Sequence, residues 1–328
     1  MLVRTCVVTA LVAVTCATSF PQRALPALKP YPLPSGVQHA VNELAAEADV
    51  LVLGETHGTR EVSEVAAALL APLAQLGYRA LAVEVPKDQQ ASLTAWATGE
   101  TSTVPSFFAQ PWEDGRGSIE ALTLIRTALS GPFGWKLICF DVTGEDLRLE
   151  MTDGIESDQM MIAFSLRRDA LMAANLSAQL RQLGPHAKAL AICGDLHART
   201  ANHPGPDKPY TALWPSLAAV LQSDDPGLRV RSIRIRPQSG AFFNGGKVHT
   251  FTEEPLERAI AIRTPEGDWT MVLRLPYSTP ATFLTTPSNN VAPAAPAKPG
   301  GGGRMCNCPR PWGPRHRRGR CRCTCKRR

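Results

Sequence analysis

Short, almost continuously apolar runs alternate with amphipathic stretches through the middle of the chain. The apolar runs have the length and the boundaries of buried strands, and they cover residues 49–54, 78–85, 135–142, 188–194 and 228–236. The stretches between them have apolar residues at helical spacing and predict helices at 61–77, 88–99, 118–130, 157–183 and about 211–222. Apolar strands separated by helices indicate a parallel sheet covered on both faces. The pattern therefore predicts an α/β fold, doubly wound or closely related.

The segments outside this alternation set the expected domain limits. Two more apolar runs, at 258–264 and 269–276, flank the turn PEGD and predict an antiparallel hairpin at the sheet edge. Residues 20–36 form a Pro-rich lead-in without helical or strand periodicity, and residues 279–303 read as a Pro/Ala/Gly linker. We therefore expect one α/β domain over residues 37–278.

The positive charge of the chain is concentrated at its end. Of a formal net charge of +6, residues 304–328 supply ten Lys or Arg and no acid, so the rest of the chain carries six minus ten, or −4. A mildly acidic body does not indicate nucleic-acid binding. The basic end could contact an anionic cell-surface polymer or lipid.

The cysteines fall into three groups along the chain, and the first group, Cys6 and Cys16, lies within the first 20 residues. Cys139 and Cys193 lie inside apolar runs and are expected to be buried. Five more crowd the basic end: Cys306, Cys308, Cys321, Cys323 and Cys325. This Cys-rich tail is expected to be disordered, to form a small disulfide knot or to hold a soft metal through thiolates.

The first residues have the features of an export signal. Arg4 precedes a short apolar run, and small residues follow it, so residues 1–19 read as a cleaved signal peptide. Lipid attachment at Cys16 is the alternative. Both interpretations predict an exported protein, which is periplasmic, secreted or bound at the cell surface.

Unusual polar side chains lie at the ends of four predicted strands. They are Glu55 and His57 after the first, Glu84 in the second, Asp141 at the third, and Asp195 and His197 after the fourth. Parallel α/β sheets bind ligands beyond the carboxyl ends of their strands. Buried carboxylates are costly unless they are paired or bind cations. Each acid could simply cap a helix or pair with an arginine, but six groups at one edge favour a functional site.

Two segments share the pattern GxxH, from Gly54 to His57 and from Gly194 to His197. Glycine permits a tight turn off the strand, and the histidine can then project over the sheet edge. Imidazoles beside carboxylates can ligate a divalent metal, or one of them can act as a base towards a water. Four of the other five histidines, His39, His186, His203 and His249, lie in loop-like sequence and are expected to be surface residues.

These segments resemble a known superfamily. LGETHGTRE (53–61) is similar to the opening motif of erythromycin esterases, and AVEVPKDQQASLTAWATGE (82–100) resembles the ChaN-like haem-binding uptake proteins. RDALMAANL (168–176) and ICGDLHAR (192–199) resemble segments of both groups. With the Tiki proteases, these groups share paired GxxH motifs, a Glu and an Arg, and the resemblance covers about residues 48–200.

The resemblance implies roles for particular residues. It makes His57 and His197 the paired histidines, and Arg168 the arginine; the acids around them are Glu55, Glu61 and Glu84. In the esterases the first histidine activates water without a metal, whereas in the Tiki proteases the same positions hold a divalent cation. In the ChaN-like proteins a tyrosine binds haem iron, but none of Tyr31, Tyr78, Tyr210 and Tyr277 falls in the matching motifs.

Taken together, the sequence predicts an exported hydrolase of ester or amide bonds, with a small-molecule or peptide substrate. His57 and Glu84 are expected to hold or deprotonate a water, while Glu55 and Glu61 orient it. His197 would be a second ligand or an acid, and a divalent metal could be held by His57, His197 and Glu84.

Two expectations remain open beside this one. Arg168 could hold Glu84 or a developing oxyanion, or could lie on the solvated face of its helix. The chain could instead be a surface protein that binds haem or an iron complex, or a scaffold that acts through its cationic tail.

Overall fold

The computed structural model describes residues 25–146, 157–203, 212–265 and 267–285. The predicted signal peptide, most of the linker and the Cys-rich tail lie outside these residues, so the expectations about them stay predictions. The helices are α1 (Ser35–Ala46), α2 (Glu61–Gln75), α3 (Gln90–Thr98), α4 (Ile119–Ser130), α5 (Ser157–Leu183) and α6 (Leu217–Asp224). The strands are β1 (Val50–Glu55), β2 (Tyr78–Pro86), β3 (Lys136–Asp141), β4 (Lys188–Gly194), β5 (Val230–Pro237), β6 (Ser239–Asn244), β7 (Lys247–Thr252), β8 (Ile260–Arg263) and β9 (Met271–Leu275).

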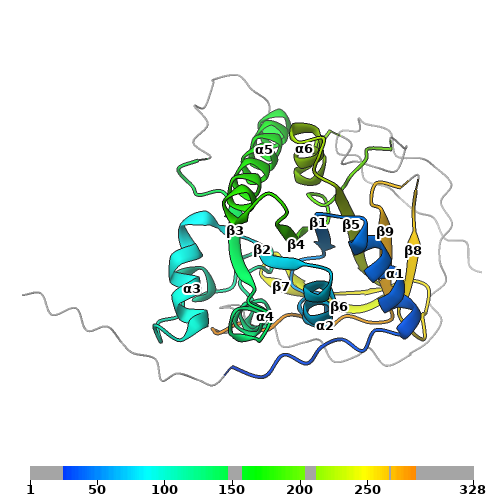
Figure 1. The fold of residues 1–328 in the computed structure, drawn as a ribbon. Coiled ribbons are helices and arrows are strands. Elements are labelled where there is room, and N and C mark those ends of the chain that lie inside the picture. Colours follow the sequence, from blue (N-terminus) through cyan, green and yellow to red (C-terminus); the bar gives the residue numbers. More distant parts are fainter. Residues whose placement is uncertain (1–24, 147–156, 204–211, 266, 286–328) are drawn as a thin grey trace, which may run out of the picture. The chain divides into compact units, whose positions relative to one another are not determined.

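Within the described residues, seven strands form the main sheet in the order β3-β2-β4-β1-β5-β9-β8 (Figure 1). Adjacent strands from β3 to β9 pair in parallel, and only β8 is antiparallel to its neighbour. The predicted α/β class and the antiparallel hairpin at the sheet edge are therefore confirmed.

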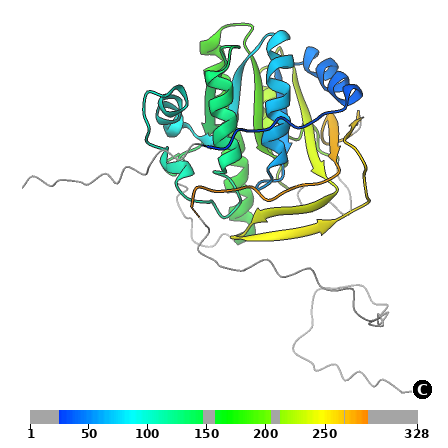
Figure 2. The same cartoon turned by 90° about the horizontal axis from the view of Figure 1, so that it is seen from below.

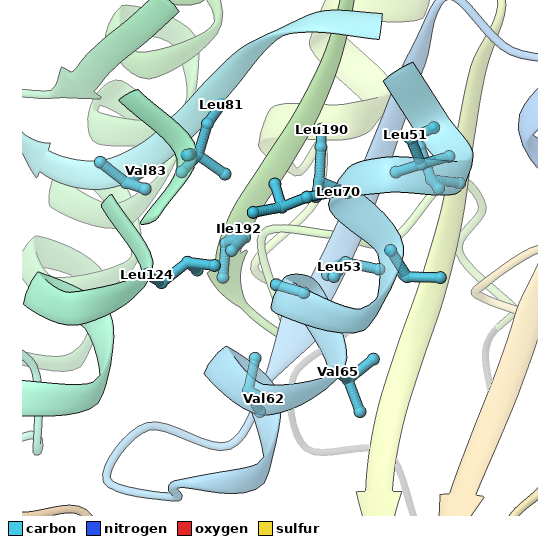
Figure 3. Packing of buried hydrophobic residues seen from close by; sticks show 14 of the residues in the cluster. Leu51, Leu53, Val62, Val65, Leu70, Leu81, Val83, Leu124, Leu190 and Ile192 are labelled. Carbon is cyan, nitrogen blue, oxygen red and sulfur yellow. The ribbon is translucent and has the colours of Figure 1, made fainter. Parts of the chain in front are cut away.

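Alternate residues of each central strand point to opposite sides of the sheet. Both faces are therefore apolar, and helices cover each of them. Leu51 and Leu53 of β1 pack in one cluster with side chains of α1, α2, α3 and α4, part of which is shown in Figure 3. Val50 and Val52 pack in a second cluster with α5 and α6. Figure 1 shows α5 and α6 on the side of the sheet opposite to α2 and α4. None of the described helices is long and apolar enough to cross a membrane.

Segments outside the expected domain limits also belong to the folded body. Residues Leu25, Leu28, Tyr31 and Leu33 pack against the first cluster, and this segment runs across the outside of the helical layer in Figure 2.

Residues 278–282, which we call the C-terminal strap, run past the first turns of α2 and α4. Thr279 N–H donates to the Glu61 carboxylate at 2.8 Å, and Thr282 Oγ1 donates to Glu120 at 2.7 Å. Each strap threonine thus binds the acid in the first turn of α2 or α4.

Three local elements differ from the prediction. The helix α1 lies where the lead-in was expected to end, and α6 begins at Leu217 rather than near residue 211, behind the side-chain cap of Ser216. The hairpin β6–β7 was not predicted, because its strands are mostly half-exposed and lack a buried apolar run. Gly245 and Gly246, both at positive φ, make its two-residue turn.

Candidate functional site

Four neighbouring strands deliver the polar residues of the sheet edge. Glu55 ends β1, Glu84 lies near the end of β2, Asp141 ends β3 and Gly194 ends β4. These strands are adjacent in the order β3-β2-β4-β1, so their parallel carboxyl ends meet. The two GxxH turns also contact each other, since Asp195 N–H donates to the Glu55 carbonyl oxygen at 2.9 Å.

Two imidazoles lie on either side of the Glu84 carboxylate. His57 Nε2 is 3.6 Å from Glu84 Oε2, and His197 Nε2 is 4.0 Å from Glu84 Oε1. Each ring is oriented by a second carboxylate at Nδ1: Glu55 lies 2.9 Å from His57, and Asp169 lies 2.5 Å from His197. Both side chains keep about a seventh of their surface exposed, at 16% and 14%.

Glu84 is the buried centre of this cluster, with 6% of its surface exposed. Its Oε2 accepts the Gly194 N–H at 2.7 Å, while Oε1 accepts from Arg168 at 2.5 Å and from Arg116 at 3.3 Å. Burial by itself would raise the pKa of Glu84, but the charges of Arg168, His57 and Arg116 outweigh burial and hold it well below its ordinary value. Glu84 is therefore an ionised carboxylate, which three cations and a backbone N–H stabilise.

Arg168 holds the carboxylates in place. Its Nε and Nη2 donate to Asp141 at 2.9 and 2.8 Å, and Nη2 also donates to Glu84. Its Nη1 lies 3.1 Å from His197 Nε2. Burial would lower the pKa of Arg168, but Glu84 and Asp141 raise it. Every nitrogen of this guanidinium has a partner. The contacts therefore favour the predicted role of holding Glu84 over that of holding an oxyanion.

The surroundings of the two histidines give them different protonation states. His57 Nδ1 is hydrogen-bonded to Glu55 at 2.9 Å, and its Nε2 lies 3.6 Å from Glu84, so a carboxylate faces each nitrogen. Burial would lower the pKa of His57, but the Glu84 charge and the bond to Glu55 raise it to about 9. His197 faces the acceptor Asp169 at Nδ1 and the donor Arg168 at Nε2, which assigns it a neutral ring with its proton on Nδ1.

Two residues of the cluster were not predicted from the sequence. Arg116 donates through Nη1 to Asp141 at 2.7 Å and through Nε to Asp114 at 2.8 Å. It lies in a loop between Gly115 and Gly117, where no periodic pattern marks it. Asp169, which orients His197, directly follows Arg168 within RDALMAANL. Its position beside a predicted site residue is the feature of the sequence that could have indicated it.

Two of the predicted residues have their contacts elsewhere. The Glu61 carboxylate binds the Thr279 N–H through both oxygens, and burial raises its pKa. Its contacts therefore attach the C-terminal strap to α2. Asp195 pairs with Arg234 at 2.7 Å and contributes to the site through its backbone.

Among the histidines outside the two motifs, His203 lies 3.2 Å from Asp268, an acid neighbour that the sequence did not indicate. His39 pairs with Glu43 on the surface at 3.3 Å, and His249 stacks on Phe242 with ring centroids 5.3 Å apart.

A divalent cation does not fit the donors that this cluster presents. Both Nε2 atoms already face charged partners, since His57 Nε2 lies 3.6 Å from Glu84 and His197 Nε2 lies 3.1 Å from Arg168 Nη1. Arg168 and Arg116 would also repel a cation beside Glu84. Among the described residues, no group of three His, Cys, Asp or Glu side chains could hold a metal ion.

Gly194 allows the two motifs to approach each other. A Cβ atom at this position would lie 2.9 Å from His57 Nε2 and 3.4 Å from His197 Cδ2. We therefore expect Gly194→Ala to displace His57 from Glu84 and to shift the NMR signals of both imidazoles. Gly36→Ala is the control, because a Cβ at Gly36 would meet nothing within 4 Å. Imidazole signals at unchanged positions in Gly194→Ala, as expected for Gly36→Ala, would contradict the close approach.

Comparison with known proteins bears on the fold. No protein-family model matches the chain, and no curated protein matches it. A solved structure of a Bacillus cereus protein matches with a TM-score of 0.55 at 12% identity, over 78% of this chain and 96% of that chain. An erythromycin esterase mutant in its open conformation matches with a TM-score of 0.43 at 13% identity, over 77% of this chain and 81% of that one. ChaN of Campylobacter jejuni with cofacially bound haem matches with a TM-score of 0.39 at 13% identity, over 72% and 90%.

The chain therefore shares its fold with the Bacillus cereus protein, and both groups named by the sequence resemblance are among the matching structures. At these identities the likeness concerns the fold alone.

Proposed function

We propose that the chain is a hydrolase of ester or amide bonds that acts without a metal. The observation that carries this proposal is the pair of imidazoles beside the Glu84 carboxylate, each held at Nδ1 by its own acid. A base and an acid whose surroundings give them different protonation states are what the hydrolysis of a carbonyl compound requires. This arrangement supports acid–base chemistry more directly than a binding or scaffold role.

The protonation states assign the roles. His197, neutral and oriented by Asp169, accepts a proton from the attacking water at Nε2, where Arg168 now donates. His57, an imidazolium oriented by Glu55, donates a proton to the leaving group. These roles differ from those expected from the sequence, which gave the base to His57, because Glu84 favours the charged form of that ring.

Arg116 supplies the donor for the developing oxyanion. Its Nε and Nη1 are engaged by Asp114, Glu84 and Asp141. Nη2 has no hydrogen-bond partner among the residues that the structure describes, and the side chain is 16% exposed. A fixed guanidinium with a free N–H beside the reacting group stabilises negative charge in the transition state.

The pH dependence of hydrolysis tests this assignment. We expect kcat/KM on simple esters or amides to fall as the pH rises through about 9, because His57 then loses the proton that it must donate. The fall of kcat/KM at high pH is measured on the purified chain and on the variant His57→Gln. The variant should be nearly inactive, and its remaining activity should not fall through pH 9. A rise in kcat/KM through pH 9 would give the base role to His57, and a profile shared by both proteins would remove His57 from the mechanism.

Haem binding, the alternative raised by the sequence, has less support. Tyr78 is buried and donates its hydroxyl to the carbonyl oxygen of Ala45 at 3.0 Å, and burial raises its pKa. Tyr31 packs against the core, Tyr210 lies outside the described residues, and Tyr277 is exposed but lies in none of the matching motifs. The cavity beside Glu84 has a volume of about 50 Å³, far below the roughly 300–1,000 Å³ of ordinary small-molecule sites.

A further inference from the structure

A small cavity extends from the proposed active site into the apolar layer of α2 and α4. At one end it is lined by Glu55, Glu84 and Arg116. Its lining also contains apolar side chains from three parts of the fold, namely Val83 and Ile192 from the sheet, Phe107 and Phe108 from a loop, and Leu124 and Ile125 from α4, together with the hydroxyl residues Ser63 and Ser118. Figure 3 shows Leu124 directed towards Ile192. The cavity therefore joins Glu55, Glu84 and Arg116 of the cluster to a buried space; His57 and His197 lie beside these residues and are not part of its lining.

The walls of this cavity are rigid. Phe107 and Phe108 pack edge to face, with ring centroids 5.2 Å apart. Gly58 and Gly115 close the cavity with backbone at positive φ, and a Cβ at Gly115 would lie 2.6 Å from the Gly58 Cα atom. Close backbone packing of this kind cannot expand to admit a longer group.

The size of the cavity limits what it can hold. Its volume of about 50 Å³ is roughly a third of the 150 Å³ cavity that binds benzene in another protein. A methyl or ethyl group fits such a space, whereas a longer chain or a ring does not.

We propose that this cavity receives the alkyl part of a short acyl group, so that the enzyme hydrolyses acetyl and propionyl esters in preference to longer ones. This inference rests on the proposed hydrolase function. With the alkyl group between Leu124 and Ile192, the acyl carbon lies near Glu55 and Glu84, and its carbonyl oxygen accepts from Arg116 Nη2. Water oxygen bonds to the acyl carbon as the bond to the alcohol oxygen breaks. His197 takes the proton of the water and His57 gives one to the leaving alcohol, so the products are a short carboxylic acid and an alcohol.

A chain-length series tests the proposal. The substrates are p-nitrophenyl acetate, butyrate and octanoate, and the variants are Leu124→Ala, which enlarges the cavity, and Ala121→Leu, which fills it. In the unmodified chain we expect kcat/KM for acetate to exceed that for butyrate at least tenfold, as one or two methylenes in a fitted pocket are worth roughly 10- to 200-fold each. Leu124→Ala should shift the preference towards butyrate, and Ala121→Leu should lose acetate hydrolysis.

The control is Leu221→Ala, which creates a similar space in the apolar cluster on the opposite face of the sheet. It should keep the preference for acetate. Because Leu124→Ala and Ala121→Leu could unfold the chain, circular dichroism and thermal unfolding accompany the kinetics, and Ile125→Val serves as a milder enlargement that should shift the preference in the same direction.

A binding measurement distinguishes the failure of this inference from the failure of the proposed hydrolase function. Saturation-transfer NMR with acetate, butyrate and hexanoate reports occupancy without turnover, and we expect acetate to bind and Ala121→Leu to abolish its signal. Acetate binding without hydrolysis would reject the hydrolase and keep the cavity as a short-chain site. Hydrolysis with one chain-length profile in all variants would reject the cavity as the acyl site and keep the hydrolase.

Discussion

Replacement of either cluster histidine by alanine is expected to lower kcat/KM by about 100-fold or more, because a positioned acid or base contributes on this scale. His57→Ala removes the imidazolium oriented by Glu55, and His197→Ala removes the neutral ring oriented by Asp169. The two rings act in one proton-transfer sequence, so the double variant should lose little more than the more damaging single variant. The measurement is steady-state hydrolysis of an ester or amide that the unmodified chain turns over.

The matched control for these variants is His39→Ala. His39 also pairs with a glutamate, Glu43 at 3.3 Å, but both side chains are largely exposed, at 76% and 55%. Its removal should leave hydrolysis unchanged and stability nearly so. Unchanged hydrolysis in folded His57→Ala and His197→Ala would reject the acid–base mechanism.

The sequence predicted where the site lies because strand polarity alone decides it. Runs such as VLVLG end in Glu55 and His57, and AICG ends before His197. In a parallel sheet these ends must meet at one edge, whatever the strand order. The order itself, with β4 between β1 and β2, is what places the two histidine turns side by side on either side of Glu84. Strand order depends on packing between distant segments, which hydrophobic periodicity does not contain.

The parts that the sequence did not predict are those fixed by loops and by tertiary charge. Arg116 reaches Glu84 and Asp141 from a glycine-flanked loop, and no spacing in the text connects them. Glu61 shows the opposite case. The resemblance of residues 53–61 to the esterase motif implied that it is a site acid, but the first turn of α2 directs it to the backbone of Thr279 in the C-terminal strap. The motifs therefore identified the edge of the sheet, and the contacts of each side chain decide which groups belong to the cluster there.

The protonation of His57 could not be read from the sequence either, since it results from the balance of burial and the charges of Glu84 and Glu55. This balance has a consequence that can be measured. Changing Glu84 should lower the pKa of His57 from about 9, because the largest favourable charge on the ring is then lost.

Glu84→Leu is expected to lower the free energy of unfolding by about 3–5 kcal/mol, the usual cost of removing one partner from a buried ion cluster. The change leaves Arg168 and Arg116 with Asp141 as their remaining shared acid, and it leaves the Gly194 N–H without its acceptor. Glu84→Gln keeps the shape and one acceptor oxygen, so it should cost less while still lowering the pKa of His57 and the turnover. Denaturant unfolding gives the free energies, and NMR titration of the imidazoles gives the pKa.

The control for this loss is Glu253→Gln, which breaks an ion pair of similar length, 2.9 Å to Arg236, between side chains that are 41% and 47% exposed. An exposed pair contributes about 0–1 kcal/mol, so the difference between the two substitutions measures what burial adds. If Glu84→Leu were as stable as Glu253→Gln, the cluster would be open to water, and its guanidinium groups would not need Glu84 as a counter-ion. The raised pKa of His57, and with it the assignment of this ring as the acid, would then lose its physical cause.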